Sequence, residues 1–141
     1  MGKKVALILL LVGLLVCVLI SCDDFGVAID AFEGTWNFPD QGGYSDITVY
    51  VDNDGNTGIA DIGFTSGDDY YYCYGSGTYS GTVLVGSYDY NRTNNTTSTT
   101  TFIDSDDSIS ITYSISGGKL SISCSGTGPL NGKSFSNGVL Q

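Results

Sequence analysis

Hydrophobic and polar residues alternate along much of the chain beyond position 34. The alternation is clearest at 109–115, where isoleucine or tyrosine takes every second position and serine or threonine the positions between. A Ser-Gly-Gly-Lys turn follows, and residues 120–124 alternate in the same way. Residues 47–51 and 60–64 also alternate, on either side of an Asp-Asn-Asp-Gly-Asn turn. A period of two is typical of a strand with one buried face, so these four segments predict two β-hairpins.

Further strands are predicted at 35–38, 70–75, 79–87 and 97–103. The total is seven or eight short strands, and no segment shows a helical period. Such a series favours a single all-β domain at 34–141. Because short turns join consecutive strands, we expect an antiparallel meander that closes as a small up-and-down barrel, in preference to a β-sandwich.

The N-terminal residues have the layout of a secretory signal. Lys3 and Lys4 precede an apolar run of 16 residues at 5–20, and the small residue Ser21 follows it. The run is shorter than the about 20 residues of a permanent membrane-spanning helix. This layout favours an export signal that is cleaved.

The end of this segment, Leu19-Ile20-Ser21-Cys22, resembles the lipobox of bacterial lipoproteins. The resemblance implies that residues 1–21 are a signal peptide and that Cys22 becomes the first residue of the mature chain. It also implies a diacylglyceryl group on the thiol of Cys22 and usually a further acyl chain, such as palmitate, on its amine. Residues 22–33 would then be the lipidated N-terminus and a tether. A simple cleaved signal or an uncleaved anchor is the alternative.

The same resemblance implies an extracytoplasmic protein, lipid-anchored to the cell membrane or the outer membrane. Asp23 and Asp24 follow the cysteine. Acidic residues at these positions accompany inner-membrane retention in some lineages of lipoproteins and surface export in others. The periplasmic and the surface side therefore both stay open.

Composition and charge exclude several classes of function. The chain has 141 residues, with 15 acidic and 5 basic side chains and no histidine. Without histidine, neither a Ser-His-Asp or Cys-His site nor a histidine-ligated zinc site can form. Loss of residues 1–21 removes two lysines and leaves 15 acidic against 3 basic residues, a side-chain charge of −12 that disfavours nucleic acid. Paired carboxylates could still serve a glycosidase, but no motif selects a pair. We expect no enzymatic activity, no cofactor and no nucleic-acid partner.

The first predicted strand opens with Gly34-Thr35-Trp36, which resembles the Gly-x-Trp opening of lipocalins and avidin-like barrels. The resemblance implies an up-and-down barrel in which the tryptophan closes one end and a small-ligand cavity lies at the other. The chain departs from the lipocalin pattern because it is short and lacks a C-terminal helix and a later Thr-Asp-Tyr motif. Only the topology is therefore carried over, with no ligand-binding residue, and Trp36 is expected in the core.

Two cysteines remain in the domain, Cys73 and Cys124. Both lie in predicted strands of a protein that is exported to an oxidising compartment, where disulfides persist. We expect them to form a disulfide, and two buried free thiols are the alternative. A redox-active site is not expected because the Cys-x-x-Cys spacing is missing.

Tyrosines dominate the segment that contains Cys73. If Cys73 faces inward, the strand period places Tyr71 inward and Tyr70, Tyr72 and Tyr74 outward. Three outward tyrosines offer rigid, amphipathic contact area for a protein or sugar partner. The alternative is that a neighbouring loop or a second sheet covers them.

The turn at 52–56 resembles the start of a calcium-binding loop. An EF-hand needs glycine at the sixth position and glutamate at the twelfth, where this chain has Thr57 and Gly63. We therefore expect a plain hairpin turn and no metal site. The acidic residues at 104–107 are likewise expected to form a solvated turn.

Two functions remain for such a domain. The first is a membrane-anchored, non-enzymatic lipoprotein that binds a small ligand, or a protein or carbohydrate partner, through the barrel mouth or the tyrosines. The second is a surface adhesion or structural coat protein without a ligand cavity. An apolar interior pocket would favour the first function. An interior filled with side chains, together with an outer patch, would favour the second.

Overall fold

The computed structural model describes residues 29–141, and residues 32–141 form one unit. The predicted signal peptide (1–21) and the predicted lipidation site, Cys22, lie outside the described residues. Within 29–141, no helix is long and apolar enough to cross a membrane.

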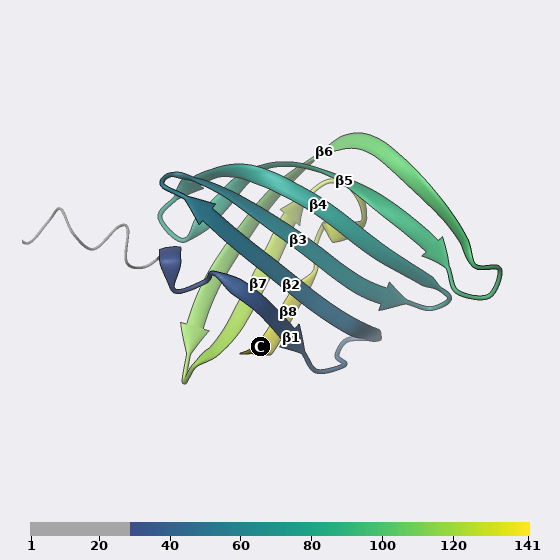
Figure 1. Ribbon diagram of the computed structural model, residues 1–141, viewed down its shortest axis with the longest axis horizontal. Helices are drawn as coiled ribbons and strands as arrows, with labels where there is room; N and C mark the ends of the chain where they lie inside the picture. The colour runs from purple at the N-terminus through teal and green to yellow at the C-terminus, as the bar shows by residue number, and fades with distance from the viewer. Residues whose placement is uncertain (1–28) are drawn as a thin grey trace, which may run out of the picture. The chain divides into compact units, whose positions relative to one another are not determined.

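Eight antiparallel strands follow one another around a single closed barrel (Figure 1). Each strand pairs with the next along the chain, and the last pairs with the first through Trp36–Leu140 and Asn37–Val139. One turn of 3-10 helix, η1, precedes the last strand. The elements are β1 (Gly34–Phe38), β2 (Tyr44–Asp54), β3 (Thr57–Ser66), β4 (Asp69–Ser80), β5 (Val83–Asn94), β6 (Thr99–Ser116), β7 (Lys119–Gly126), η1 (Gly128–Leu130) and β8 (Ser134–Leu140). The predicted all-β meander is confirmed, and its strands form a barrel instead of a sandwich.

Some strand boundaries differ from those predicted. The segment 79–87 is divided by a turn between β4 and β5, where Gly81 takes a φ of +62° that favours glycine. Most of the segment 97–103 and all of 109–115 belong to one strand, β6, which begins at Thr99. The last strand, β8, was not predicted. Asn137, at a φ of +64°, interrupts the alternation of buried and exposed residues between Phe135 and Gly138.

The acidic segment at 104–107 forms a bulge within β6 and not a turn. The register between β5 and β6 shifts between Tyr88 and Tyr90, so residues 104–106 all lie opposite Asp89. The backbone N–H groups of Ser105 and Asp106 donate to Asp89 Oδ1 at 3.0 and 3.1 Å. One carboxylate therefore stabilises a bulge that the alternation of apolar residues does not reveal.

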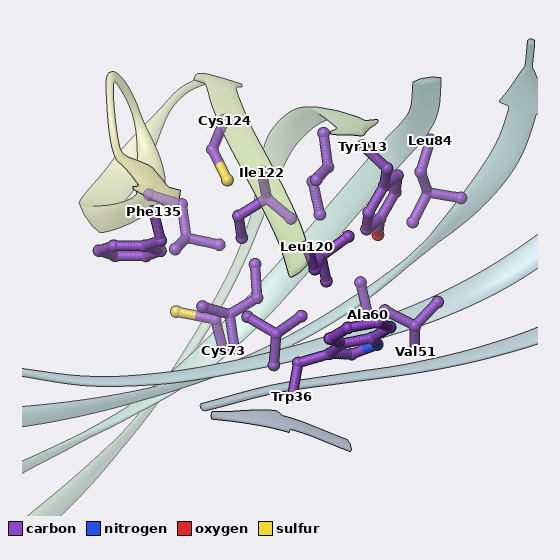
Figure 2. Packing of buried hydrophobic residues seen from close by; sticks show 14 of the residues in the cluster. Trp36, Val51, Ala60, Cys73, Leu84, Tyr113, Leu120, Ile122, Cys124 and Phe135 are labelled. Atoms are coloured by element: carbon purple, nitrogen blue, oxygen red, sulfur yellow. The ribbon is translucent and has the colours of Figure 1, made fainter. Parts of the chain in front are cut away.

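Inward side chains from all eight strands pack together in the barrel (Figure 2). Trp36 is among them, as predicted, and is 3% exposed. Its Nε1 donates to the carbonyl oxygen of Phe32 at 2.8 Å, and Phe32 stacks on Tyr113 with ring centroids 5.1 Å apart. The strands' buried residues are Trp36, Phe38, Ile47, Val49, Val51, Ala60, Ile62, Phe64, Cys73, Leu84, Tyr88, Ile109, Ile111, Tyr113, Leu120, Ile122, Cys124 and Phe135.

A second group of aromatic rings fills the other end of the barrel. Phe64 stacks on Tyr71 with centroids 5.2 Å apart and meets Phe135 at 6.0 Å. Tyr44 presents its edge to both phenylalanines, at 5.7 and 5.9 Å. Both ends are thus closed by aromatic side chains, and the interior is occupied by the protein itself.

Three glycines form an inward row across neighbouring strands, with Gly58 paired to Gly77 and Gly77 to Gly86. A β-carbon on Gly86 would lie 2.6 Å from the Cα of Gly77 and would also collide with the carbonyl oxygen of Ser76. The ring of Tyr79 occupies the space over Gly58, where a β-carbon would lie 2.6 Å from its Cε2. The row therefore allows the close backbone approach and the inward ring that side chains would prevent.

Tyr88 fixes the connection between β7 and β8. Its buried hydroxyl donates to the carbonyl oxygen of Thr127 at 2.7 Å and accepts from the N–H of Leu130 at 3.0 Å. Burial raises the pKa of Tyr88, which keeps this hydroxyl protonated as a donor. Both polar backbone groups are thereby satisfied beneath the 3-10 turn.

Candidate functional site

The three tyrosines predicted to face outward lie on the outside of β4. Tyr71 and Cys73 point inward, Cys73 being fully buried, while Tyr74 is 41% exposed and Tyr70 and Tyr72 are half-buried. We call Tyr70, Tyr72 and Tyr74 the tyrosine strip. The barrel consists of one closed sheet, so no second sheet covers the strip in the described part of the chain.

The strip is half-buried because its rings lie against one another and against the sheet. Tyr72 and Tyr74 meet edge to face with centroids 4.8 Å apart. The hydroxyl of Tyr70 lies beside Thr48 over Gly63, at a place where a β-carbon on Gly63 would collide with it. Burial is the main cause that raises the pKa of Tyr70 and of Tyr72, so both hydroxyls remain neutral.

Neighbouring strands add residues that the sequence did not reveal. Asp61 on β3 lies between Tyr50 on β2 and Tyr74 in the cross-strand register, and Tyr50 is 41% exposed. On β6, Phe102 is 60% exposed and pairs with Asn91 of β5. We call the tyrosine strip together with Tyr50, Phe102, Asp61 and Asn91 the aromatic face. The alternation of β2 already indicated an outward Tyr50, but only the register between strands brings it beside Asp61.

Hydrogen bonds join the polar members of the aromatic face to its rings. The hydroxyl of Tyr72 donates to Asp61 Oδ2 at a long 3.4 Å, and Asn91 Nδ2 donates to the hydroxyl of Tyr74 at 2.7 Å. Burial raises the pKa of Asp61, and the hydrogen bond from Tyr72 opposes this rise. The carboxylate is thus partly desolvated, with one weak partner.

An open hollow of about 510 Å³ continues the aromatic face along the strands. Ser76, the next outward position on β4 after Tyr74, lines it, as do Asp52 and Asp54 of β2 and Ile59 of β3. Ile59 is 46% exposed. The lining of the hollow thus combines an exposed isoleucine with two carboxylates.

The opposite side of the barrel has a different surface. Outward positions of β6, β7 and β8 carry hydroxyl side chains, which line a smaller hollow of about 290 Å³. We call these residues the serine face: Thr112, Ser114, Ser121, Ser123, Ser134 and Ser136. The outward aromatic side chains are therefore gathered on one side of the molecule and do not surround it.

Basic side chains are scarce within residues 29–141, where only Arg92, Lys119 and Lys133 occur. Arg92, on β5, pairs with Tyr71 and therefore lies on the same, inward side of the sheet as Tyr71. Lys119 is the first residue of β7. The ammonium group of Lys133 lies 5.0 Å from the ring centroid of Tyr44. None of these three residues belongs to the aromatic face.

One cluster of three aspartates within residues 29–141 could hold a metal ion. The carboxylates of Asp89, Asp104 and Asp106 lie within 4.8 Å of one another at the β6 bulge. Asp89 already accepts two backbone hydrogen bonds there, which explain the clustering without an ion. The turn at 52–56 joins β2 to β3 as a plain hairpin, with Gly55 at a φ of +60°.

Cys73 and Cys124 are free, buried thiols in the structure, which does not contain the predicted disulfide. They lie on β4 and β7, three positions apart in the ring, and Figure 2 shows their sulfur atoms well separated. A disulfide needs Cα atoms about 4.4–6.8 Å apart, an arrangement that a strand pattern alone does not ensure. Burial raises the pKa of both thiols, that of Cys124 to about 12, which makes them unreactive.

We therefore expect iodoacetamide, without reductant, to leave Cys73 and Cys124 unmodified in the native protein. After unfolding in guanidinium chloride, both should be alkylated, because only burial protects them. Peptide mass mapping measures the alkylation at each cysteine. Thiols that stay unmodified after unfolding, and react only once a reductant is added, would show that the disulfide forms.

No family model, curated protein or solved structure matches the chain. The described residues thus form a filled barrel that has aromatic side chains on one side and hydroxyl side chains on the other.

Proposed function

We propose that the protein is a non-enzymatic lipoprotein of the cell envelope that binds a protein or carbohydrate partner through the aromatic face. The lipid on Cys22 would hold the mature chain on the extracytoplasmic side of a membrane, as the lipobox resemblance implies. The barrel would then serve as a rigid support for a surface site. The proposed binding requires no cofactor and involves no nucleic acid.

One observation carries the proposal: aromatic side chains are exposed on one side of a barrel whose interior is already full. Tyr50 and Tyr74 are each 41% exposed and Phe102 is 60% exposed. Side chains of this kind are enriched in binding interfaces, where rigid rings give large contact area at low entropic cost. The filled interior supports an external partner over a small ligand in the barrel mouth.

The filled interior equally supports the second candidate, a surface adhesion or structural coat protein without a ligand cavity. In that case the barrel would act by covering a surface or adhering to it. The two candidates differ in specificity, because a binding lipoprotein has one partner at one face. Adhesion or coating through general surface properties would involve both sides of the barrel.

Photo-crosslinking in cells that produce the full chain tests this proposal. A diazirine amino acid is placed at Ser76, beside the aromatic face, or at Ser123, on the serine face. Both positions are exposed serines that line hollows on the outside of the barrel, so they are matched controls. We expect an adduct of defined mass from position 76 and none from position 123, measured by intact mass.

The change of Tyr72 and Tyr74 to serine should abolish the adduct from position 76 while circular dichroism shows an unchanged barrel. Equal adducts from both faces would support the coat or adhesion function instead. The complete absence of adducts from position 76 would contradict a binding role for the aromatic face.

A further inference from the structure

The aromatic face carries a carboxylate, Asp61, next to the tyrosine strip. Asp61 lies between Tyr50 and Tyr74 in the register, and the hydroxyl of Tyr72 is its hydrogen-bond donor, at 3.4 Å. The side chain is half-buried, so part of its hydration has been lost. The aromatic face contains no lysine or arginine that could neutralise it.

The chain as a whole offers little compensation for this charge. Of its 15 acidic residues, all but Asp23 and Asp24 fall within residues 29–141, which leaves 13 acidic against 3 basic side chains there. The hollow that continues the aromatic face adds Asp52 and Asp54. A partner with positive charge would therefore meet Asp61 on the aromatic face and two further carboxylates in the hollow.

Tyrosine rings and a carboxylate together form a suitable environment for an ammonium or guanidinium group. The faces of such rings attract cations, and the attraction grows when water is excluded. The aliphatic stems of lysine and arginine can lie along rings while their charged ends reach a carboxylate. Asp61 provides the carboxylate, and Tyr72 and Tyr74 beside it provide the rings.

The dimensions of the surface suit an extended chain. From Tyr70 to Ser76, the outward positions of β4 span six residues, which is about 20 Å at the rise of a β-strand. Four outward side chains lie along this line: the three of the tyrosine strip and then Ser76 in the acidic hollow. A peptide of about six residues in extended conformation has the same length.

We propose that the occupant of the aromatic face is an extended, lysine- or arginine-bearing segment of a protein partner. One cationic side chain lies against Tyr72 and Tyr74 and pairs with Asp61. A second reaches Asp52 or Asp54 in the hollow. This inference rests on the proposed function, since it names the class of partner for the same face.

Fluorescence anisotropy with the full-length lipidated protein in detergent micelles tests this inference. The probe is a fluorescein-labelled ten-residue peptide with lysine at every second position, and its acetyl-lysine version is the neutral control. The variant Asp61→Asn removes the charge and keeps an acceptor for Tyr72. The variant Asp40→Asn removes one exposed charge from the connection between β1 and β2, outside the aromatic face.

We expect saturable binding of the lysine peptide and none of the acetylated peptide. Asp61→Asn should raise the Kd at least about tenfold, whereas Asp40→Asn should raise it less than about twofold. Tyr74→Ser should also raise the Kd, with an unchanged circular dichroism spectrum. Equal effects of Asp61→Asn and Asp40→Asn would show unspecific attraction by net charge and would overturn the inference.

A neutral oligosaccharide, cellohexaose, separates this inference from the proposed function. If it binds through Tyr72 and Tyr74 while the lysine peptide does not, the face has a sugar partner and the cationic partner is rejected. If an adduct forms at position 76 but the peptide fails to bind, the proposed function stands and this inference fails. If neither the adduct nor peptide binding is found, both fail.

Discussion

Replacement of Gly86 by alanine is expected to destabilise the barrel by at least about 3 kcal/mol. A β-carbon there would lie 2.6 Å from the Cα of Gly77 and against the carbonyl oxygen of Ser76. Both obstacles belong to the backbone of the neighbouring strand, so no side-chain rotation can relieve the contact. The strands would have to separate where Gly77 and Gly86 are paired. Because small domains have only about 5–15 kcal/mol of stability, this loss is a large fraction of the total, and the variant should unfold at a clearly lower urea concentration.

Urea unfolding followed by tryptophan fluorescence measures this loss, since Trp36 is the one tryptophan and is buried. Gly117→Ala provides the control. Gly117 lies in a turn at a φ of +58° with open space around it, so alanine there costs only about 1 kcal/mol of backbone strain. Equal losses of stability from the two variants would contradict the close approach of β4 and β5.

Replacement of Cys22 by serine is expected to remove all acyl chains from the protein. A lipobox cysteine carries three acyl chains in the full modification, and each buried methylene contributes about 0.8 kcal/mol to membrane attachment. Serine has no thiol for the diacylglyceryl group, so all of this attachment is lost. The strongly acidic domain has no attraction to anionic lipid that could replace it.

Detergent phase partition with Triton X-114 measures the anchoring. The wild-type protein should enter the detergent phase with the mass of a chain cut before Cys22 plus its acyl groups, and the Cys22→Ser variant should lack that added mass. Cys17→Ser is the matched control, because this cysteine lies within the predicted signal peptide and would be removed with it. Wild-type protein that enters the detergent phase without acyl groups on Cys22 and with residues 1–21 still attached would show an uncleaved hydrophobic anchor in place of the lipid.

Periodicity predicted much of this fold because the barrel has one buried face and one solvated face. At 109–115 every second residue is apolar, and Ile109, Ile111 and Tyr113 are indeed buried in β6. The period of two is lost where a backbone feature interrupts a strand. The turn at Gly81, the bulge at 104–106 and Asn137 in β8 are irregularities of this kind.

The surface could be predicted only within a single strand. Alternation around Cys73 correctly separated Tyr71 from the tyrosine strip, because adjacent residues of a strand face opposite sides. It could not place Tyr50 and Asp61 beside Tyr74, since that depends on the register of β2 and β3 and on the irregularity between Ser45 and Thr48. Contacts across the barrel, such as that expected between the cysteines, depend on the ring as a whole.

The pairing of β1 with β8, which we call the seam, closes the barrel and affects the order in which the strands come together. Trp36 meets Leu140 there, so the first and last strands must find each other across about a hundred residues of chain. The hairpins in between can form locally, but none of them completes the ring. Formation of the seam therefore has to be a late step, taken when the last strand is available. If the chain is exported as we propose, the barrel closes only after the whole domain has crossed the membrane.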